Sequence, residues 1–170
     1  LVIEGSGNSG ITIASGNINE GFIMFADDGS QLAGLIGYKQ GDNYMEFRTN
    51  ASEKMRITSD GNVGIGTAAP SGSPTKGVLH IENTTTSAAG EGASLRLSSK
   101  DGAAAIGSGH RMGIIDFQGE EDGSGTMISG GAIEVFAEQA WGGSENSSYM
   151  TFKTNQSDNS FLERMRITST

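Results

Sequence analysis

The sequence contains no cysteine, only two prolines, and few large apolar residues. The lack of cysteine excludes disulfide bonds and thiolate metal sites. Leu, Ile, Val and Phe together make up 33 of the 170 residues, about 19%, which is near the level at which an independent hydrophobic core becomes doubtful. We therefore expect each chain to bury part of its apolar surface against identical neighbours, because one chain alone has too little core.

Other absences restrict the function. The sequence has no run of 18 apolar residues and no signal peptide, so we expect no membrane insertion. A net charge of −9 without any cluster of Lys or Arg argues against a nucleic-acid partner. Such a charge is also found in disordered chains, but the ordered spacing of the apolar residues argues against disorder. The chain lacks an initiator Met and begins in mid-pattern, so we expect it to be a piece of a longer protein.

One phrase occurs twice in the chain. Residues 44–50 read YMEFRTN and residues 149–155 read YMTFKTN; after a gap, EKMRITS at 53–59 is matched by ERMRITS at 163–169. A repeat this close predicts a tandem array of one module, which is an arrangement suited to length and display rather than to catalysis.

The repeat also gives the expected domain boundaries. Residues 1–67 form the first module, 78–170 form the second, and 68–77 form a linker rich in Pro, Gly and Ser. The second copy carries insertions that leave the shared phrases intact, so we expect them in surface loops. These insertions are Glu120–Gly131, Ala137–Ser148 and Gln156–Leu162.

Hydrophobic alternation with a period of two predicts an all-β fold of many short antiparallel strands, and no segment has a helical stripe. Four Asp-Gly pairs mark turns in which φ is positive, at residues 28–29, 60–61, 101–102 and 122–123. The expected strands include Ile11–Ile13, Tyr44–Thr49, Lys54–Thr58, Leu79–Glu82, Ser94–Ser98 and Ala132–Phe136.

The phrase Met-Arg-Ile places Met and Ile on one strand face and Arg on the other. Arg56 and Arg166 are then either solvated or paired with an acidic residue across a subunit boundary, with Glu53 and Glu163 as candidates. We expect the apolar residues of the repeated phrase to pack in the core or between subunits. They are Met55, Ile57, Phe47, Phe152, Met165 and Ile167.

Gly64 and Gly66 form a Gly-x-Gly sequence with a superficial likeness to a phosphate loop. The third glycine of such a loop and its following helix are missing. A structural interpretation is favoured, in which a tight turn leads into a strand whose glycines allow several backbones to approach closely near an axis.

The string KMRITSDGNVGIGT at 54–67, followed by Pro70 and then LHI at 79–81, resembles a repeat of bacteriophage tail-fibre and related virion structural proteins. The resemblance implies a homotrimer along a long axis, with interlocked β-structure, located in the virion as an extracellular appendage. It also implies a role in host recognition or as a scaffold. The residues of this module are structural in that family, so no catalytic or binding residue is carried over.

Three other functions remain open beside a phage fibre. Similar repeats occur in some large bacterial surface proteins, so an adhesin or filament subunit is one. A polysaccharide-degrading tailspike is the second, and a purely structural virion component is the third. Flanking sequence would distinguish an adhesin from a phage fibre. Release of reducing sugar from a host capsule would reveal a tailspike.

The candidates for chemistry are few, and we expect no catalytic residue, no cofactor and no metal site. Asp27-Asp28 and Glu120-Glu121-Asp122 allow a glycosidase pair or a Ca²⁺ site, but adjacent residues in extended chain point to opposite faces, and solvated turns are the ordinary interpretation. His80 aligns with Val2, which suggests an inward or subunit-facing position; a ring of such histidines can hold a metal, although a packed or exposed histidine is favoured. His110 is the only other histidine.

Receptor contact is the most plausible chemistry. The insertions carry the only tryptophan, Trp141, and Phe161, among Gly, Ser and Asn. An aromatic ring in a polar loop suits stacking on a sugar or anchoring a protein surface, so a host cell-surface glycan or protein is the expected partner. For Trp141 itself, the favoured interpretation is that it caps the local core under a long loop. Tyr38 is a weaker candidate in the first module.

Overall fold

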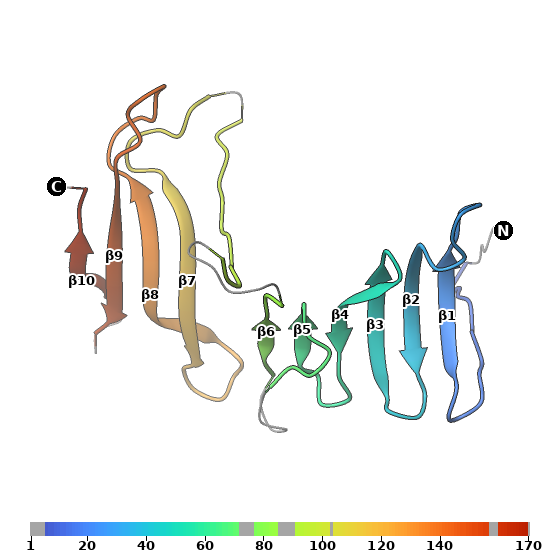
Figure 1. Ribbon diagram of the computed structural model, residues 1–170. Helices are drawn as coiled ribbons and strands as arrows, with labels where there is room; N and C mark the ends of the chain where they lie inside the picture. Colours follow the sequence, from blue (N-terminus) through green and yellow to red (C-terminus); the bar gives the residue numbers. More distant parts are fainter. Residues whose placement is uncertain (1–5, 72–76, 85–90, 103, 157–159, 170) are drawn as a thin grey trace. The chain divides into compact units, whose positions relative to one another are not determined.

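The structure is a computed structural model that describes residues 6–71, 77–84, 91–102, 104–156 and 160–169. The described residues form strands and no helix, which confirms the all-β prediction. The chain divides into two compact units, one ending at Leu95 and the other starting at Arg96, and each contains one sheet (Figure 1). Each unit is therefore built around a single layer of strands.

The first sheet has six strands in the order β1-β2-β3-β4-β5-β6. Neighbouring strands are antiparallel except β5 and β6, which are parallel, so the prediction of antiparallel pairing was wrong for this pair. The strands are β1 (Glu20–Phe25), β2 (Gly34–Lys39), β3 (Tyr44–Thr49), β4 (Ser52–Ile57), β5 (Val63–Ile65) and β6 (Leu79–Ile81).

The second sheet has four antiparallel strands in the order β10-β9-β8-β7. They are β7 (Arg111–Glu120), β8 (Met127–Ala137), β9 (Ser148–Asn155) and β10 (Phe161–Ile167). The repeated phrases thus form the β3–β4 hairpin in one sheet and the β9–β10 hairpin in the other. Because β6 pairs with β5, residues 79–81 belong to the first sheet; the boundaries 1–67, 68–77 and 78–170 concern the sequence copies and stay a prediction.

Two predicted strands, Ile11–Ile13 and Ser94–Ser98, are not strands. Part of each lies over a sheet face instead. A Cβ on Gly21 of β1 would be 3.2 Å from Cγ2 of Ile13, and a Cβ on Gly113 of β7 would be 3.1 Å from the Leu97 Cβ. In these segments, alternate side chains face the sheet, but the backbone makes no strand-to-strand hydrogen bonds with it.

The Asp-Gly turns follow the prediction at three of four sites, because φ is positive at Gly61, Gly102 and Gly123 but not at Gly29. At the fourth site the Asp27 side chain makes the turn instead. Its Oδ1 accepts hydrogen bonds from the backbone N–H groups of Gly29 at 2.9 Å and Ser30 at 2.6 Å. A local carboxylate can replace the conformational freedom of glycine in this way.

Gly64 and Gly66 are required by the folding of their own chain. A Cβ on Gly64 would lie 2.5 Å from the carbonyl oxygen of Thr67, and one on Gly66 would collide with the carbonyl oxygen of Glu82. Gly66 also has φ of 78°. The close approach that was expected between several chains near an axis is thus already made within one chain, where β5 meets the segment after β6.

We predict that Gly66→Ala destabilises the protein far more than Gly61→Ala. The two glycines have nearly the same φ, 78° and 79°, but a Cβ on Gly61 meets nothing within 4 Å. Gly61→Ala should cost only the left-handed strain, about 1–2 kcal/mol, whereas Gly66→Ala adds a backbone collision and should cost about 3 kcal/mol or more. Urea unfolding at one fixed protein concentration measures both. Equal losses would show that the contact with Glu82 is relieved without cost.

Candidate assembly interface

One face of the first sheet is apolar across all six strands. The strand register aligns two rows of residues on this face, because the members of one row lie two positions from those of the other along each strand. Neither row contains a charged side chain. The first row is Ile23, Ile36, Phe47, Met55, Ile65 and Ile81, and the second is Gly21, Tyr38, Met45, Ile57, Val63 and Leu79.

The second sheet has a matching face. Its two rows run across β7, β8, β9 and β10 and also lack charge. The first row is Ile115, Ile133, Phe152 and Met165, and the second is Gly113, Val135, Met150 and Ile167. We call these two surfaces the apolar faces. All six packing candidates of the repeated phrase lie on them.

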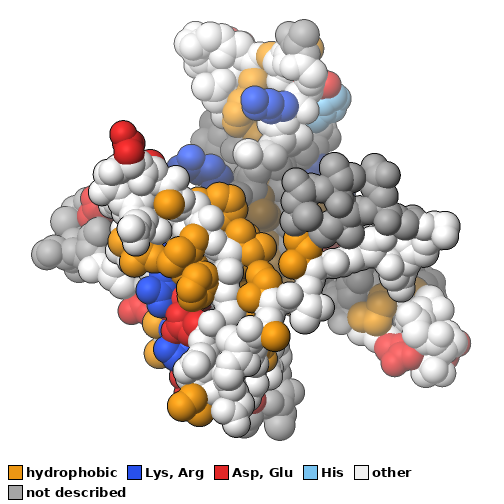
Figure 2. Space-filling view, turned by 90° about the vertical axis from the view of Figure 1, so that its right-hand side faces the viewer, with side chains coloured by type: hydrophobic (Ala, Val, Ile, Leu, Met, Phe, Trp, Pro, Cys, Tyr) orange, Lys and Arg blue, Asp and Glu red, His pale blue; other side chains and the backbone are white. Residues whose placement is uncertain are grey.

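The apolar faces are not covered within the described chain. Among the described hydrophobic residues, only Leu35, Ala132 and Ala137 are buried, and none of them belongs to the four rows. Exposure reaches 57% at Leu79 and 53% at Ile167, while Phe47 and Phe152 are half-buried. Hydrophobic side chains are accordingly gathered at the molecular surface in Figure 2. The packing residues thus form a surface rather than a core in the single chain.

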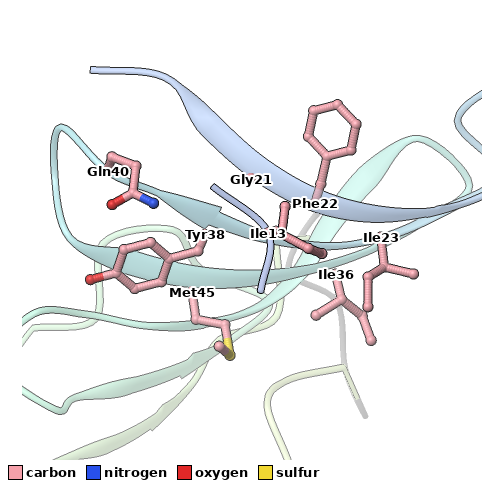
Figure 3. Close-up of a pocket in the computed structure, with 9 residues that line it drawn as sticks. Ile13, Gly21, Phe22, Ile23, Ile36, Tyr38, Gln40 and Met45 are labelled. Carbon is pink, nitrogen blue, oxygen red and sulfur yellow. The ribbon is translucent and has the colours of Figure 1, made fainter. Parts of the chain in front are cut away.

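Each apolar face has a shallow hollow beside its glycine. The hollow of the first sheet is about 290 Å³ and lies between Ile13, Gly21 and Met45 (Figure 3). The hollow of the second is about 310 Å³ and lies between Leu97, Gly113 and Met150. The glycines leave room for Ile13 and Leu97, so residues outside the strands complete both faces.

Tyr38 lines the first hollow rather than a loop tip. Figure 3 shows its ring on the same side of the sheet as Met45, with Phe22 projecting to the other side. Its hydroxyl donates to Oδ1 of Asn43 at 3.2 Å. As a receptor-contact candidate Tyr38 is therefore placed on the apolar face, together with the packing residues.

The opposite face of each sheet carries a buried carboxylate. Glu46 is 2% exposed and accepts a hydrogen bond from Nη2 of Arg48 at 3.0 Å. Glu134 is 3% exposed and pairs with Arg111 at 2.8 Å and Lys153 at 2.6 Å. Buried carboxylates need such partners, because a lone buried charge is very costly. Sequence reasoning missed both residues; a charge inside an alternating apolar strand, as in Tyr44-Met45-Glu46-Phe47, was the available signal.

Arg56 and Arg166 form ion pairs within their own chain. Arg56 donates to both carboxylate oxygens of Glu53, at 2.8 and 2.7 Å, and its guanidinium lies 3.7 Å from the centre of the Tyr44 ring. Arg166 makes the same contacts with Glu163, at 2.8 and 2.7 Å, and lies 4.3 Å from the Tyr149 ring. Of the two alternatives, pairing with Glu53 and Glu163 is observed, but both pairs form within one chain rather than across a subunit boundary.

A β-bulge explains this pairing. Residues three apart in a regular strand point to opposite faces. In β4, Met55 is opposite Phe47 and Glu53 is opposite Arg48, which leaves Lys54 as an extra residue. In β10, Arg164 is extra in the same way, between Glu163 and Met165. The extra residue brings each glutamate to the face of its arginine, and it keeps Met55 and Met165 on the apolar side.

The remaining aromatic candidates lie in the second unit. Trp141 is half-buried; its backbone N–H donates to the carbonyl of Ile106 at 2.8 Å and its Nε1 donates to the carbonyl of Ser147 at 3.2 Å. Phe161 is the first residue of β10 and is also half-buried, with Nζ of Lys153 6.0 Å from its ring centre. Phe161 is thus part of a strand, and Trp141 is held in the β8–β9 loop.

The two histidines belong to different units. His80 is half-buried and opposite Gly64 in the parallel pair, on the face away from the apolar rows; its expected inward or subunit-facing position stays a prediction. Its Nδ1 accepts a hydrogen bond from the Ser71 backbone at 3.1 Å. His110 lies in the other unit, with its Nδ1 3.3 Å from Oδ2 of Asp101.

The acidic turns use their carboxylates locally. Oδ1 of Asp122 accepts from the Ser124 N–H at 3.0 Å, and Oε1 of Glu120 accepts from the Gly125 N–H at 2.6 Å, much as Asp27 does in its own turn. Among the described residues, no three His, Asp or Glu side chains are grouped so that they could hold a metal ion.

Comparison with known protein families gave no matching family model, and comparison with curated proteins gave no significant match. No helix in the described part of the chain is long and apolar enough to cross a membrane. The function must therefore be inferred from the apolar faces, the loops and the repeated phrase.

We predict that Glu134 stabilises the protein in a pH-dependent manner. Burial alone would raise the pKa of Glu134, but the hydrogen bonds from Lys153 and Arg111 outweigh this and leave its pKa below the ordinary 4.5. A depressed pKa gives stability that is fully present above the unfolded-state value, about 4.3, and is lost as pH falls through the lower folded value. Glu134→Gln should cost about 1–3 kcal/mol at pH 7.

Thermal melting followed by circular dichroism from pH 7 to pH 3 measures the effect. The difference in Tm between wild type and Glu134→Gln should shrink below about pH 4.3. Glu91→Gln, at an exposed position, serves as the control and should leave the curve unchanged. A Tm difference that stays constant across the whole range would show that the charge of Glu134 does not contribute.

Proposed function

We propose that this chain is a structural and adhesive module of a bacteriophage tail fibre, in which three identical chains pack their apolar faces together and display loops for host-surface recognition. The observation that carries the proposal is that each single-layer sheet has one charge-free apolar face left uncovered. Soluble monomers rarely expose contiguous apolar patches of more than a few hundred Å², and larger ones mark interaction surfaces.

A second copy of the same chain suits these faces. A surface without charge can pack on a copy of itself without burying an unpaired ion, which is the main obstacle to self-association of polar surfaces. Most charged groups of both sheets lie on the opposite side, where Glu46, Glu134 and the two Glu–Arg pairs have ion-pair partners within the chain. The bulge residue Arg164 differs, because its Nε donates to Oγ1 of Thr154 at 2.9 Å, two residues beyond Phe152 in β9. The opposite face can therefore remain toward solvent in an assembly.

The number three comes from the resemblance of the repeated phrase, not from the sheet geometry. The resemblance also supports the location in a virion appendage. An adhesin or filament subunit of a bacterial surface would use the apolar faces in the same way, and the neighbouring sequence distinguishes the two. A chaperone or attachment domain supports a phage fibre, whereas a membrane anchor or secretion signal supports an adhesin.

The loops at the ends of the second sheet are the parts suited to recognition. The β7–β8 loop and the β8–β9 loop are exposed at nearly every described position, and they contain no residue of the apolar rows. An assembly that covers the apolar faces would therefore leave these loops accessible. A purely structural virion component would not use these loops for recognition. Adsorption to host cells therefore distinguishes an adhesive role from a purely structural one.

We predict a solution mass of three chains, each of 17.6 kDa. Light scattering over a hundredfold dilution should give an unchanged trimeric mass, because the trimer is the form in which the apolar faces are buried. A folded monomer throughout the series would reject the proposed assembly. A stable dimer would retain the interface but reject the fibre symmetry.

We predict that Ile57→Asp abolishes assembly, because it would place an unpaired carboxylate within the interface. Lys54→Asp is a matched control, since Lys54 is an exposed residue of the same strand and lies in the bulge rather than in an apolar row. Light scattering should show a monomer for the first variant and the wild-type mass for the second. A normal trimer of Ile57→Asp would contradict the assignment of the interface.

A further inference from the structure

A hollow of another kind lies at one end of the second unit. Its volume is about 720 Å³, within the range of small-molecule sites, and no residue of the apolar rows lines it. We call it the Trp141 hollow. It is lined by residues 99–102, 104–106, 141–143 and 146, of which Ser99, Lys100, Asp101, Ile106, Trp141 and Asn146 carry the larger side chains.

The hollow is anchored to the sheet. The Trp141 N–H donates to the Ile106 carbonyl at 2.8 Å, which ties the two lining segments together. Gly109 and His110 then exchange backbone hydrogen bonds with Ala137, at 2.9 and 3.0 Å, and Ala137 is fully buried at the end of β8. The two lining segments are therefore joined to each other, and residues 109–110 connect one of them to the end of β8.

Trp141 supplies apolar ring surface at this site. Its only side-chain donor, Nε1, is already used on the Ser147 carbonyl at 3.2 Å, and this bond fixes the plane of the indole. The ring is half-buried, so part of it is left to the hollow. A ligand that contacts Trp141 would do so through C–H groups against the ring rather than by a hydrogen bond.

Polar groups line the same hollow as Trp141. Asp101 is 43% exposed, with one carboxylate oxygen 3.3 Å from His110, and Lys100 and Ser99 line the same wall. The other lining residues are small, so nothing bulky prevents a flat ligand from reaching the indole. These small residues are Gly102, Ala104, Ala105, Gly142 and Gly143.

We propose that the Trp141 hollow binds an uncharged saccharide, whose ring stacks on the indole and whose hydroxyls hydrogen-bond to Asp101 and Lys100. This inference rests on the proposed function and names the ligand class of its recognition loops. The electron-rich face of an indole attracts the partly positive C–H groups of a sugar ring, while carboxylate and ammonium groups match its hydroxyls.

Other ligand classes fit the hollow less well. A phosphate or an acidic sugar requires several cations, but among the described residues that line the hollow Lys100 is the only Lys or Arg, and Asp101 offsets its charge. A lipid or another apolar ligand requires a mostly hydrophobic, enclosed pocket, whereas this one is wide and partly polar.

The fluorescence of Trp141 provides the test, because it is the only tryptophan in the chain. Maltotriose and chitotriose are titrated as uncharged probes, and sialyllactose as a charged comparison. We expect a saturable change in emission with at least one uncharged probe at millimolar concentration, and weaker or no binding of sialyllactose. No change with either uncharged probe would overturn the proposal, as would tighter binding of sialyllactose.

Two variants locate the binding. Asp101→Asn should bind about tenfold more weakly, because a charged acceptor is replaced by a neutral one, and Trp141→Ala should abolish binding measured by calorimetry. Gln31→Ala, an exposed residue of the other unit, is the control and should bind normally. Unchanged binding by Trp141→Ala would reject this site.

The mass measured by light scattering separates this inference from the proposed assembly. A wild-type trimer that binds no sugar would reject the saccharide site and retain the assembly. A monomer that binds sugar through Trp141 would reject the assembly and retain the site. Point variants are preferable to deleting 137–148, because Ala137 is fully buried and belongs to β8.

Discussion

The structure depends on one constraint: each unit has a single layer of strands, and its described residues supply no second layer to cover the apolar side. The opposite side is stabilised locally by ion pairs and by side chains that cover Glu46 and Glu134. On the apolar side, Ile13 and Leu97 lie over a glycine of the first and second sheet, respectively. Domains are normally built from two packed layers, so each sheet lacks the layer that a partner would provide.

The two sheets share the same local structural features. Each has a bulge that aligns a glutamate with an arginine three residues later, and each stacks that arginine on a tyrosine. Their buried carboxylates come from different strands. Glu46 on β3 is opposite Gly37, whereas Glu134 on β8 is opposite Thr151 on β9, which is 1% exposed. A duplicated module would produce this pattern if the buried carboxylate had changed from one strand of a paired position to the other. Glu46 on β3 has Gly37 on β2 as its partner, and Glu134 on β8 has Thr151 on β9.

Much of the fold could be predicted from alternation, and the exceptions have physical causes. Tyr44–Thr49 and Ala132–Phe136 were identified as strands because their side chains alternate between unlike environments. Ile11–Ile13 alternates too, but alternation reveals which side is apolar and not whether a neighbour supplies backbone hydrogen bonds. The bulges at Lys54 and Arg164 could not be seen, because Met-Arg-Ile alternates regularly and the added residue comes just before it.

The residues of the repeated phrase that form the candidate surfaces could be predicted, but the other residues that share a face with them could not. Phe47, Met55 and Ile57 were identified because the repeat marked them, while the four consecutive apolar residues Phe22–Phe25 concealed which of them share a face with Ile36. The strand register shows that Ile23 is the residue opposite Ile36, and the register depends on how β1 pairs with β2. The Trp141 hollow required coordinates as well, because residues 99–106 have no sequence signal that relates them to residue 141.

The confinement of every described ion pair to its own unit has a consequence for the environment in which an assembly holds together. Salt screens attraction between charges, but the described ion pairs would require no charge attraction between chains in the proposed assembly. Contact between apolar faces would instead depend on the hydrophobic effect, which weakens on cooling and is strengthened by excluded salts. Cohesion of this kind tolerates wide changes in ionic strength, and low temperature is the condition under which it is weakest.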